Sequence, residues 1–110
     1  MTLNPRPLMF AAALLAAGAP AIAQDATALR DRSLAATCAQ CHGTDGHPPA
    51  GSAMRPLAGR PAPYLAEQLL AFRSGERAGT VMPQIAKGYG DAQVARLAAY
   101  FPAVPAVIGP

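Results

Sequence analysis

Cys38-Ala39-Gln40-Cys41-His42 is the stretch of this sequence that decides its fold. The spacing Cys-x-x-Cys-His is the attachment motif of a c-type haem. The two-residue gap lets the two thiols add to the two vinyl groups on one edge of the porphyrin, and the adjacent histidine supplies a proximal nitrogen to the iron. The motif predicts one covalent haem c, with Cys38 and Cys41 as its thioether residues and His42 as an iron ligand.

Three other interpretations of the cysteines are open at this point. A plain disulfide would suit an oxidising compartment, but it does not explain His42. A thioredoxin-like redox pair wants the motif at the start of a helix that follows a strand, and no strand pattern precedes Cys38. A structural zinc site needs four ligands, whereas the chain after its leader offers two Cys and two His.

The first 23 residues have the features of a secretory signal peptide. Arg6 provides the positive start, residues 8–19 carry no charge, and Ala21-Ile22-Ala23 forms a small-x-small cleavage site. A retained membrane anchor is the alternative interpretation, but the apolar stretch is shorter than the roughly 20 residues that a spanning helix needs. The leader predicts a periplasmic protein with no stable membrane insertion after cleavage.

Cleavage after Ala23 would leave residues 24–110 as one small domain. Its eight Lys+Arg and six Asp+Glu give a net charge of +2, too small an excess to predict nucleic acid binding. A domain of this size buries a modest core, and this one has no Trp. A cofactor at its centre is therefore expected.

Apolar spacing and the Gly and Pro positions predict an all-α domain of three to four helices. The strongest stripes are Leu65, Leu69 and Phe72 in the middle of the chain and Val94, Leu97 and Phe101 near its end. The expected elements are a helix from Asp25 or Thr27 to about Cys38, a loop over 43–60, a helix from Pro61–Pro63 to Gly75, a loop over 76–90, a helix capped by Asp91 and halted by Pro102, and an extended tail over 102–110.

This order of elements resembles a class I cytochrome c with one haem. The likeness covers nearly all of residues 26–101. Four blocks are similar to the cytochrome subunit of flavocytochrome c sulfide dehydrogenase and to one half of two-haem bacterial cytochromes c. The blocks are Phe72-Arg73-Ser74-Gly75-Glu76, Thr80-Val81-Met82, Ile85-Ala86-Lys87-Gly88-Tyr89 and Ala99-Tyr100-Phe101.

Met82 is the predicted sixth iron ligand, since electron-carrying cytochromes c commonly pair His with Met. It lies forty residues beyond His42, past a full helix, and the resemblance implies the same residue. Met54 is the alternative, but it lies only twelve residues beyond His42, inside the loop that must wrap the proximal edge. His47, five residues beyond His42, is expected to be a surface loop residue rather than a second histidine ligand.

The resemblance also implies roles for Pro56, Leu57 and Leu34. The Pro56 carbonyl would accept the His42 Nδ1–H, an outer-shell bond that orients the ligand, and Leu57 would pack on the haem. The alternative for Pro56 is a plain turn residue. Leu34 would meet the C-terminal helix, at a position where many relatives carry an aromatic residue.

Two protein ligands leave no open site on the iron, so the predicted function is one-electron transfer without catalytic residues of its own. The resemblance implies a flavoprotein partner that oxidises sulfide. The alternatives are a free monohaem carrier between dehydrogenases and an oxidase, and a gas-binding or peroxidase-like haem protein. The predicted docking patch is Ala53, Met54, Val81, Pro83 and Ile85, with Arg55, Arg73, Arg77 and Lys87 at its rim.

Overall fold

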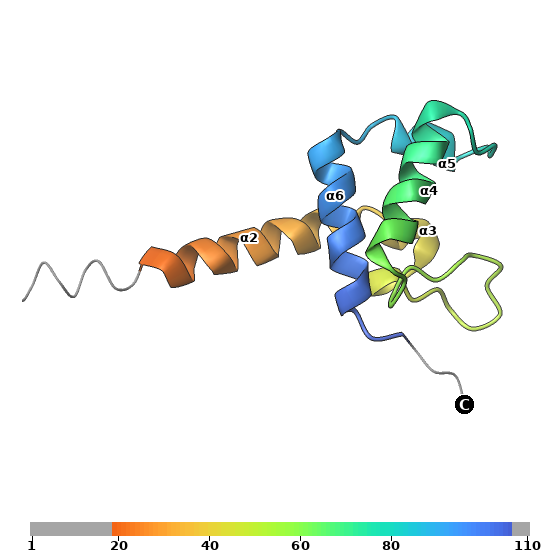
Figure 1. Ribbon diagram of the computed structural model, residues 1–110. Helices are drawn as coiled ribbons and strands as arrows, with labels where there is room; N and C mark the ends of the chain where they lie inside the picture. Colours follow the sequence, from red (N-terminus) through yellow and green to blue (C-terminus); the bar gives the residue numbers. More distant parts are fainter. Residues whose placement is uncertain (1–18, 107–110) are drawn as a thin grey trace, which may run out of the picture. The chain divides into compact units, whose positions relative to one another are not determined.

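A computed structural model describes residues 19–106 of the chain, with side chains from residue 22 onward. This part is helical and contains no strand, so the predicted all-α class is confirmed (Figure 1). None of the helices within these residues has the length and apolarity to cross a membrane. The helices are α2 (Ala19–Ala36), α3 (Ala39–His42), α4 (Ala62–Ser74), α5 (Met82–Ala86) and α6 (Asp91–Tyr100), with 3-10 turns η1 (Thr44–Gly46) and η2 (Phe101–Ala103).

The chain divides into two units, with the boundary between Arg30 and Asp31. In the first unit, α2 begins at Ala19, so the prediction of a start at Asp25 or Thr27 was wrong. The Thr27 hydroxyl donates to the Ala23 carbonyl at 3.0 Å, a bond inside a continuing helix rather than a cap. Alanine-rich sequence without an internal breaker explains the earlier start. Most of the predicted signal peptide, residues 1–18, lies outside the described residues.

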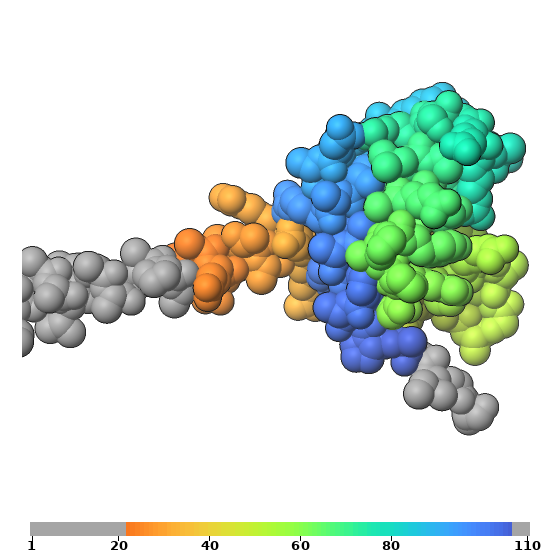
Figure 2. Space-filling view, in the orientation of Figure 1, coloured from red at the N-terminus to blue at the C-terminus, as the bar shows by residue number. Residues whose placement is uncertain are grey.

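The core of the second unit is a cluster of buried residues at the crossing of α4 and α6, here called the helical cluster. The two helices pack against each other, and their side chains meet in the space-filling view (Figures 1 and 2). Leu34 packs against the cluster from the end of α2, as predicted. Arg96 of α6 also donates to Asp31 at 2.5 Å. The helical cluster consists of Ala35, Leu65, Leu97, Ala98 and Phe101.

The ends of α4 follow the expected signals. Pro61 is the N-cap of α4, a position whose backbone N–H has no hydrogen-bond partner within the helix, so the proline removes no helical bond. Gly75 ends the helix in the left-handed conformation with φ +85°. At α6 the predicted cap was wrong by one residue: Gly90 is the N-cap, and its N–H donates to Gln93 Oε1 at 3.0 Å. The Asp91 carboxylate instead accepts a bond from Arg73 at 2.6 Å.

Four short elements were not predicted: α3, η1, α5 and η2. Helix α5 lies inside the segment expected to be a loop, and η2 carries the chain one turn beyond α6 before the backbone becomes extended at Val104. None of the four is long enough to show a periodic apolar pattern. The prediction of an extended tail over 102–110 is therefore only partly correct. Residues 107–110 lie outside the described residues.

Candidate haem site

The cysteines and the adjacent histidine are brought together by the break between α2 and α3. Backbone bonds from Cys38 N to Ala35 O and from His42 N to Cys38 O, both 3.0 Å, close the two turns around this break. Cys38 is half-buried, Cys41 is exposed, and neither is in a disulfide. The structure thus leaves both thiols available on one turn of the chain, and the disulfide interpretation was wrong.

His42 is oriented by a backbone carbonyl. Its Nδ1 lies 2.8 Å from the Arg55 oxygen. Because a carbonyl oxygen only accepts, Nδ1 carries the proton and donates, and Nε2 keeps its lone pair. The imidazole is therefore held in the tautomer that binds a metal through Nε2.

The predicted acceptor of this bond, the Pro56 carbonyl, was wrong by one residue. Pro56 is exposed, and its oxygen accepts a bond from Arg60 Nε at 3.3 Å instead. A residue that precedes proline is confined to extended conformations, so the orientation of the Arg55 carbonyl is restricted by Pro56. Pro56 acts on the histidine through the conformation of its neighbour rather than through its own oxygen.

The loop that carries Arg55, residues 43–61 and here called the first loop, is organised around the buried Gly46. The Gly46 carbonyl accepts bonds from Leu57 N at 2.9 Å and Ala58 N at 3.3 Å. A Cβ on Gly46, which has φ +77°, would lie 2.8 Å from the Leu57 Cβ. Leu57 itself is half-buried against the helical cluster. The close approach at Gly46 therefore fixes the path of the chain on both sides of the loop.

The two candidate methionine ligands have different surroundings. Met82 is half-buried and is the first residue of α5, followed by Pro83 in the first turn. Pro83 lies close to Phe72 across Gly79, where a Cβ would be 3.2 Å from Pro83 and 3.3 Å from Phe72. Met54 is 38% exposed in the first loop. Met82 therefore lies on a helix that packs against α4, whereas Met54 lies on an exposed part of the first loop.

His47 is half-buried and lies against the C-terminal tail. Its Nε2 donates to the Pro105 carbonyl at 2.7 Å, so this ring nitrogen is not available to bind a metal. Nearby, the Tyr100 hydroxyl donates to Asp45 at 2.9 Å. Burial, and then this bond to a carboxylate, raises the pKa of Tyr100. These bonds tie the first loop to α6 and the tail, so His47, predicted as a surface loop residue, is a loop residue that also has a structural role.

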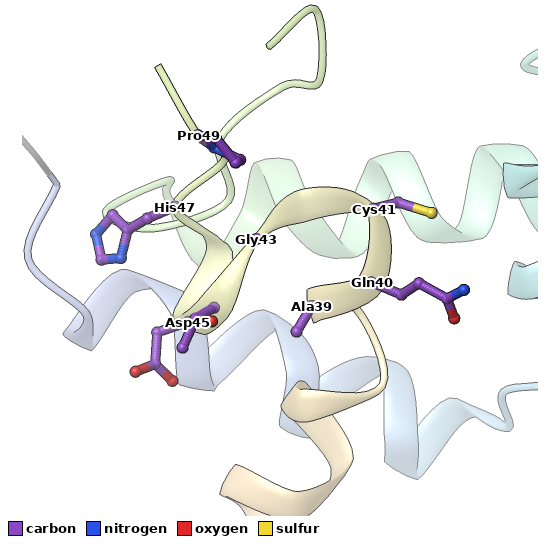
Figure 3. Close-up of a pocket in the computed structure, with 8 residues that line it drawn as sticks. Ala39, Gln40, Cys41, Gly43, Asp45, His47 and Pro49 are labelled. Carbon is purple, nitrogen blue, oxygen red and sulfur yellow. The ribbon is translucent and has the colours of Figure 1, made fainter. Parts of the chain in front are cut away.

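A hollow of about 610 Å³ lies beside the attachment segment (Figure 3). Cys41 and His47 lie at opposite ends of it, and their side chains point away from each other. Small and polar residues line it, whereas a site for a large apolar ring needs mostly apolar walls. The lining residues are Ala39, Gln40, Cys41, Gly43, Thr44, Asp45, His47 and Pro49. This hollow is therefore not the haem crevice.

The residues present fit a haem on three observations. His42 offers an unprotonated nitrogen next to two free thiols. Four of the eight buried hydrophobic residues described are alanines. Val81 and Ile85 are 56% and 45% exposed, so the chain covers the apolar side chains beside Met82 only in part. No group of three or more His, Cys, Asp and Glu side chains within residues 19–106 could hold a bare metal ion, which removes the zinc interpretation for this part of the chain.

Three residues near the site have contacts that were not predicted from the sequence. Arg55 is one, because only its backbone oxygen takes part. The others are Thr37 and Tyr89, whose hydroxyls lie 2.7 Å apart although the residues are 52 positions apart in the chain. A long-range contact of this kind has no periodic signal, and only the position of Thr37 directly before Cys38 could have drawn attention to it.

The fold and the Cys-Cys-His segment define a c-type cytochrome. Residues 24–101 match the family model described as cytochrome c oxidase, cbb3-type, subunit III. The chain belongs to this family of cytochrome c domains, within the class I cytochromes c, and its cofactor is covalently bound haem c with iron.

Several curated proteins are similar to the chain. It is 36% identical over 85 residues to the cytochrome subunit of sulfide dehydrogenase of Chlorobaculum tepidum, covering 77% of this chain and 74% of that protein. Identity to cytochrome c-554(548) of Halomonas halodenitrificans is 39%, covering 72% and 95%. Identity to the thiosulfate dehydrogenase electron acceptor of Thiomonas intermedia is 43%, covering 61% of this chain and 31% of that protein. These relatives support an electron carrier.

Proposed function

We propose that the chain transfers single electrons in the periplasm through a haem iron ligated by His42 and Met82, with thioether bonds to Cys38 and Cys41. The observation that carries the proposal is the 2.8 Å bond from His42 Nδ1 to the Arg55 carbonyl, which presents Nε2 for metal ligation. The haem, when bound, supplies the reversible change between ferric and ferrous iron. Leu57 would cover part of the ring from the first loop.

The protein residues would ligate the iron, bury the haem and exclude oxygen and peroxide from the iron. A bond accepted by the Arg55 oxygen increases the electron density on the imidazole, and a thioether from Met82 favours the reduced iron. Two protein ligands leave no position for oxygen or peroxide. The expected result is a holoprotein that does not bind carbon monoxide when reduced, whereas rapid carbon monoxide binding would favour the gas-binding alternative.

The partner we propose is a sulfide-oxidising flavoprotein, for which this chain would be the cytochrome subunit. The similarity to the Chlorobaculum tepidum cytochrome subunit of sulfide dehydrogenase supports this choice. Exposed apolar residues for a lasting contact are available at Met54, Val81 and Ile85. A patch of this kind stabilises a complex by the apolar area that it removes from water.

The charged rim of that patch is smaller than the sequence suggested. Arg73 is engaged by Asp91 and by the Tyr89 carbonyl. Arg77 lies 4.5 Å above the Phe72 ring and donates to Gln68. Exposed Arg55 and Lys87 are left as the rim, where charge influences association rate more than affinity.

Gel filtration of a periplasmic extract separates this function from its runner-up, a diffusible monohaem carrier. A lasting subunit would elute as a larger complex, with flavin and haem absorbance in the same fractions. A carrier would elute at the size of the monomer without flavin, and that result would overturn the subunit proposal. Repeating the run at high salt tests the apolar contact, because salt weakens charged encounters but not buried apolar ones.

A further inference from the structure

Tyr89 connects the segment that carries Met82 to the segment that carries Cys38. Its backbone N–H donates to the Ala86 carbonyl at 3.2 Å, so Tyr89 lies directly after the last turn of α5. Its hydroxyl lies 2.7 Å from the Thr37 hydroxyl. Helix α5 is therefore held to the haem-attachment segment by one side-chain bond.

The direction of this bond follows from the single proton of each hydroxyl. Thr37 Oγ1 also lies 2.7 Å from the Leu34 carbonyl, which only accepts, so the Thr37 proton is committed to Leu34. Tyr89 must then be the donor to Thr37. The Tyr89→Phe substitution would remove this bond and leave the Thr37–Leu34 bond in place.

The backbone of Tyr89 is held from the opposite side. Arg73 of α4 donates through Nη1 to the Tyr89 carbonyl at 3.0 Å and through Nη2 to Asp91 at 2.6 Å. The ring packs against the helical cluster. With its main chain and ring both fixed, the hydroxyl of Tyr89 is directed at Thr37 at little entropic cost.

Both hydroxyls are also beside the Cys38 sulfur. Thr37 directly precedes Cys38 in the chain, and burial raises the pKa of the Cys38 thiol. The Tyr89–Thr37 bond thus lies next to the atom through which the chain would hold the haem.

We propose that Tyr89 is a positioning residue whose hydroxyl, bonded to Thr37 beside Cys38, fixes helix α5 and thereby holds the Met82 thioether on the haem iron. This inference rests on the proposed His/Met ligation. Losing the bond removes one of the contacts that hold α5 near the attachment segment, so the fraction of molecules with Met82 displaced rises. An external ligand that binds only those molecules then binds more tightly in proportion.

Imidazole is the probe, because it competes with Met82 for the ferric iron. Its affinity is measured on the holoprotein from the loss of the weak long-wavelength sulfur-to-iron absorption band. The Tyr89→Phe variant is expected to bind imidazole about fivefold more tightly, which corresponds to the roughly 1 kcal/mol of one hydrogen bond. Thr37→Val should give a similar increase, whereas Thr37→Ser, which keeps the hydroxyl, should behave as the wild type.

Tyr64→Phe is the matched control. Tyr64 is a half-buried tyrosine of α4 that packs against the same helical cluster, and its hydroxyl makes no hydrogen bond among the described residues. Its imidazole affinity should change less than twofold, even if its thermal midpoint falls as much as that of Tyr89→Phe. The double variant Tyr89→Phe/Thr37→Val should show the increase of one single variant rather than the product of two, since both remove the same bond.

The outcomes separate this inference from the function beneath it. If the wild type lacks the sulfur-to-iron band, His/Met ligation fails and the role of Tyr89 fails with it. If the band is present and Tyr89→Phe binds imidazole as the wild type does, only the role of Tyr89 is overturned. Multiplicative effects in the double variant would also overturn it, because they would show two independent perturbations.

Discussion

The helical cluster and the first loop, residues 43–61, are stabilised in different ways. In the cluster, apolar side chains such as Leu97, which is 2% exposed, exclude water at a helix crossing. In the loop, backbone groups bond to the Gly46 carbonyl, and several glycines adopt positive φ. The cluster depends on apolar spacing along two helices, whereas the loop depends on individual positions. The loop also carries the Arg55 carbonyl that orients His42. The site therefore depends on the region in which single positions matter most.

The largest effect is expected from removing the haem. The double variant Cys38→Ala/Cys41→Ala cannot attach haem, and we expect it to be largely unfolded. Its buried hydrophobic residues are few and half of those described are alanines, so neither region has an alternative core. Far-UV circular dichroism and thermal melting check this.

Wild-type chain produced without haem attachment is the control, and it should show the same loss of helix. Native helix content with a cooperative melt in either sample would contradict the prediction. That result would mean that the helical cluster folds without help from the cofactor.

The next largest effect is expected in the helical cluster. Leu97→Ala should lower the free energy of unfolding of the holoprotein by about 2–5 kcal/mol, through lost burial and the cavity left behind. Leu70→Ala on α4 is the control, because Leu70 is 41% exposed and its loss should cost less than about 1 kcal/mol. Denaturant unfolding measures both. Equal losses for the two variants would show that the cluster does not carry the stability of this unit.

A smaller effect separates two glycines of the first loop. Gly43 and Gly51 have nearly the same φ, +81° and +80°. A Cβ on Gly43 would lie 1.9 Å from the His47 carbonyl oxygen, whereas one on Gly51 would meet nothing within 4 Å. Gly51→Ala should therefore cost only the positive φ, about 1–2 kcal/mol, and Gly43→Ala about 2 kcal/mol more.

Denaturant unfolding of the two holoproteins checks this difference. A common value would mean that the loop relaxes around the new methyl group, and that backbone approach does not fix its conformation. Since Gly43 directly follows His42, the haem absorption of Gly43→Ala should also shift while that of Gly51→Ala stays unchanged.

The same division explains what could be predicted from the sequence. Apolar periodicity placed α4 and α6 and their buried residues, because packing at a helix crossing leaves a repeating signal. The motif placed Cys38, Cys41 and His42 together. It could not identify Arg55 as the acceptor, since backbone conformation in a loop depends on its hydrogen bonds rather than on side-chain type. Helix α5 was missed because five residues are too few for a period.

Iron ligation by Met82 is the central claim, and the ferric absorption spectra of Met82→Ala and Met54→Ala holoproteins test it most directly. In both variants Cys38 and Cys41 remain, so haem stays attached and the two samples differ only in the available thioether. We expect Met82→Ala to lose the weak sulfur-to-iron band and Met54→Ala to keep it. A band that persists in Met82→Ala and disappears in Met54→Ala would contradict the account and make Met54 the ligand.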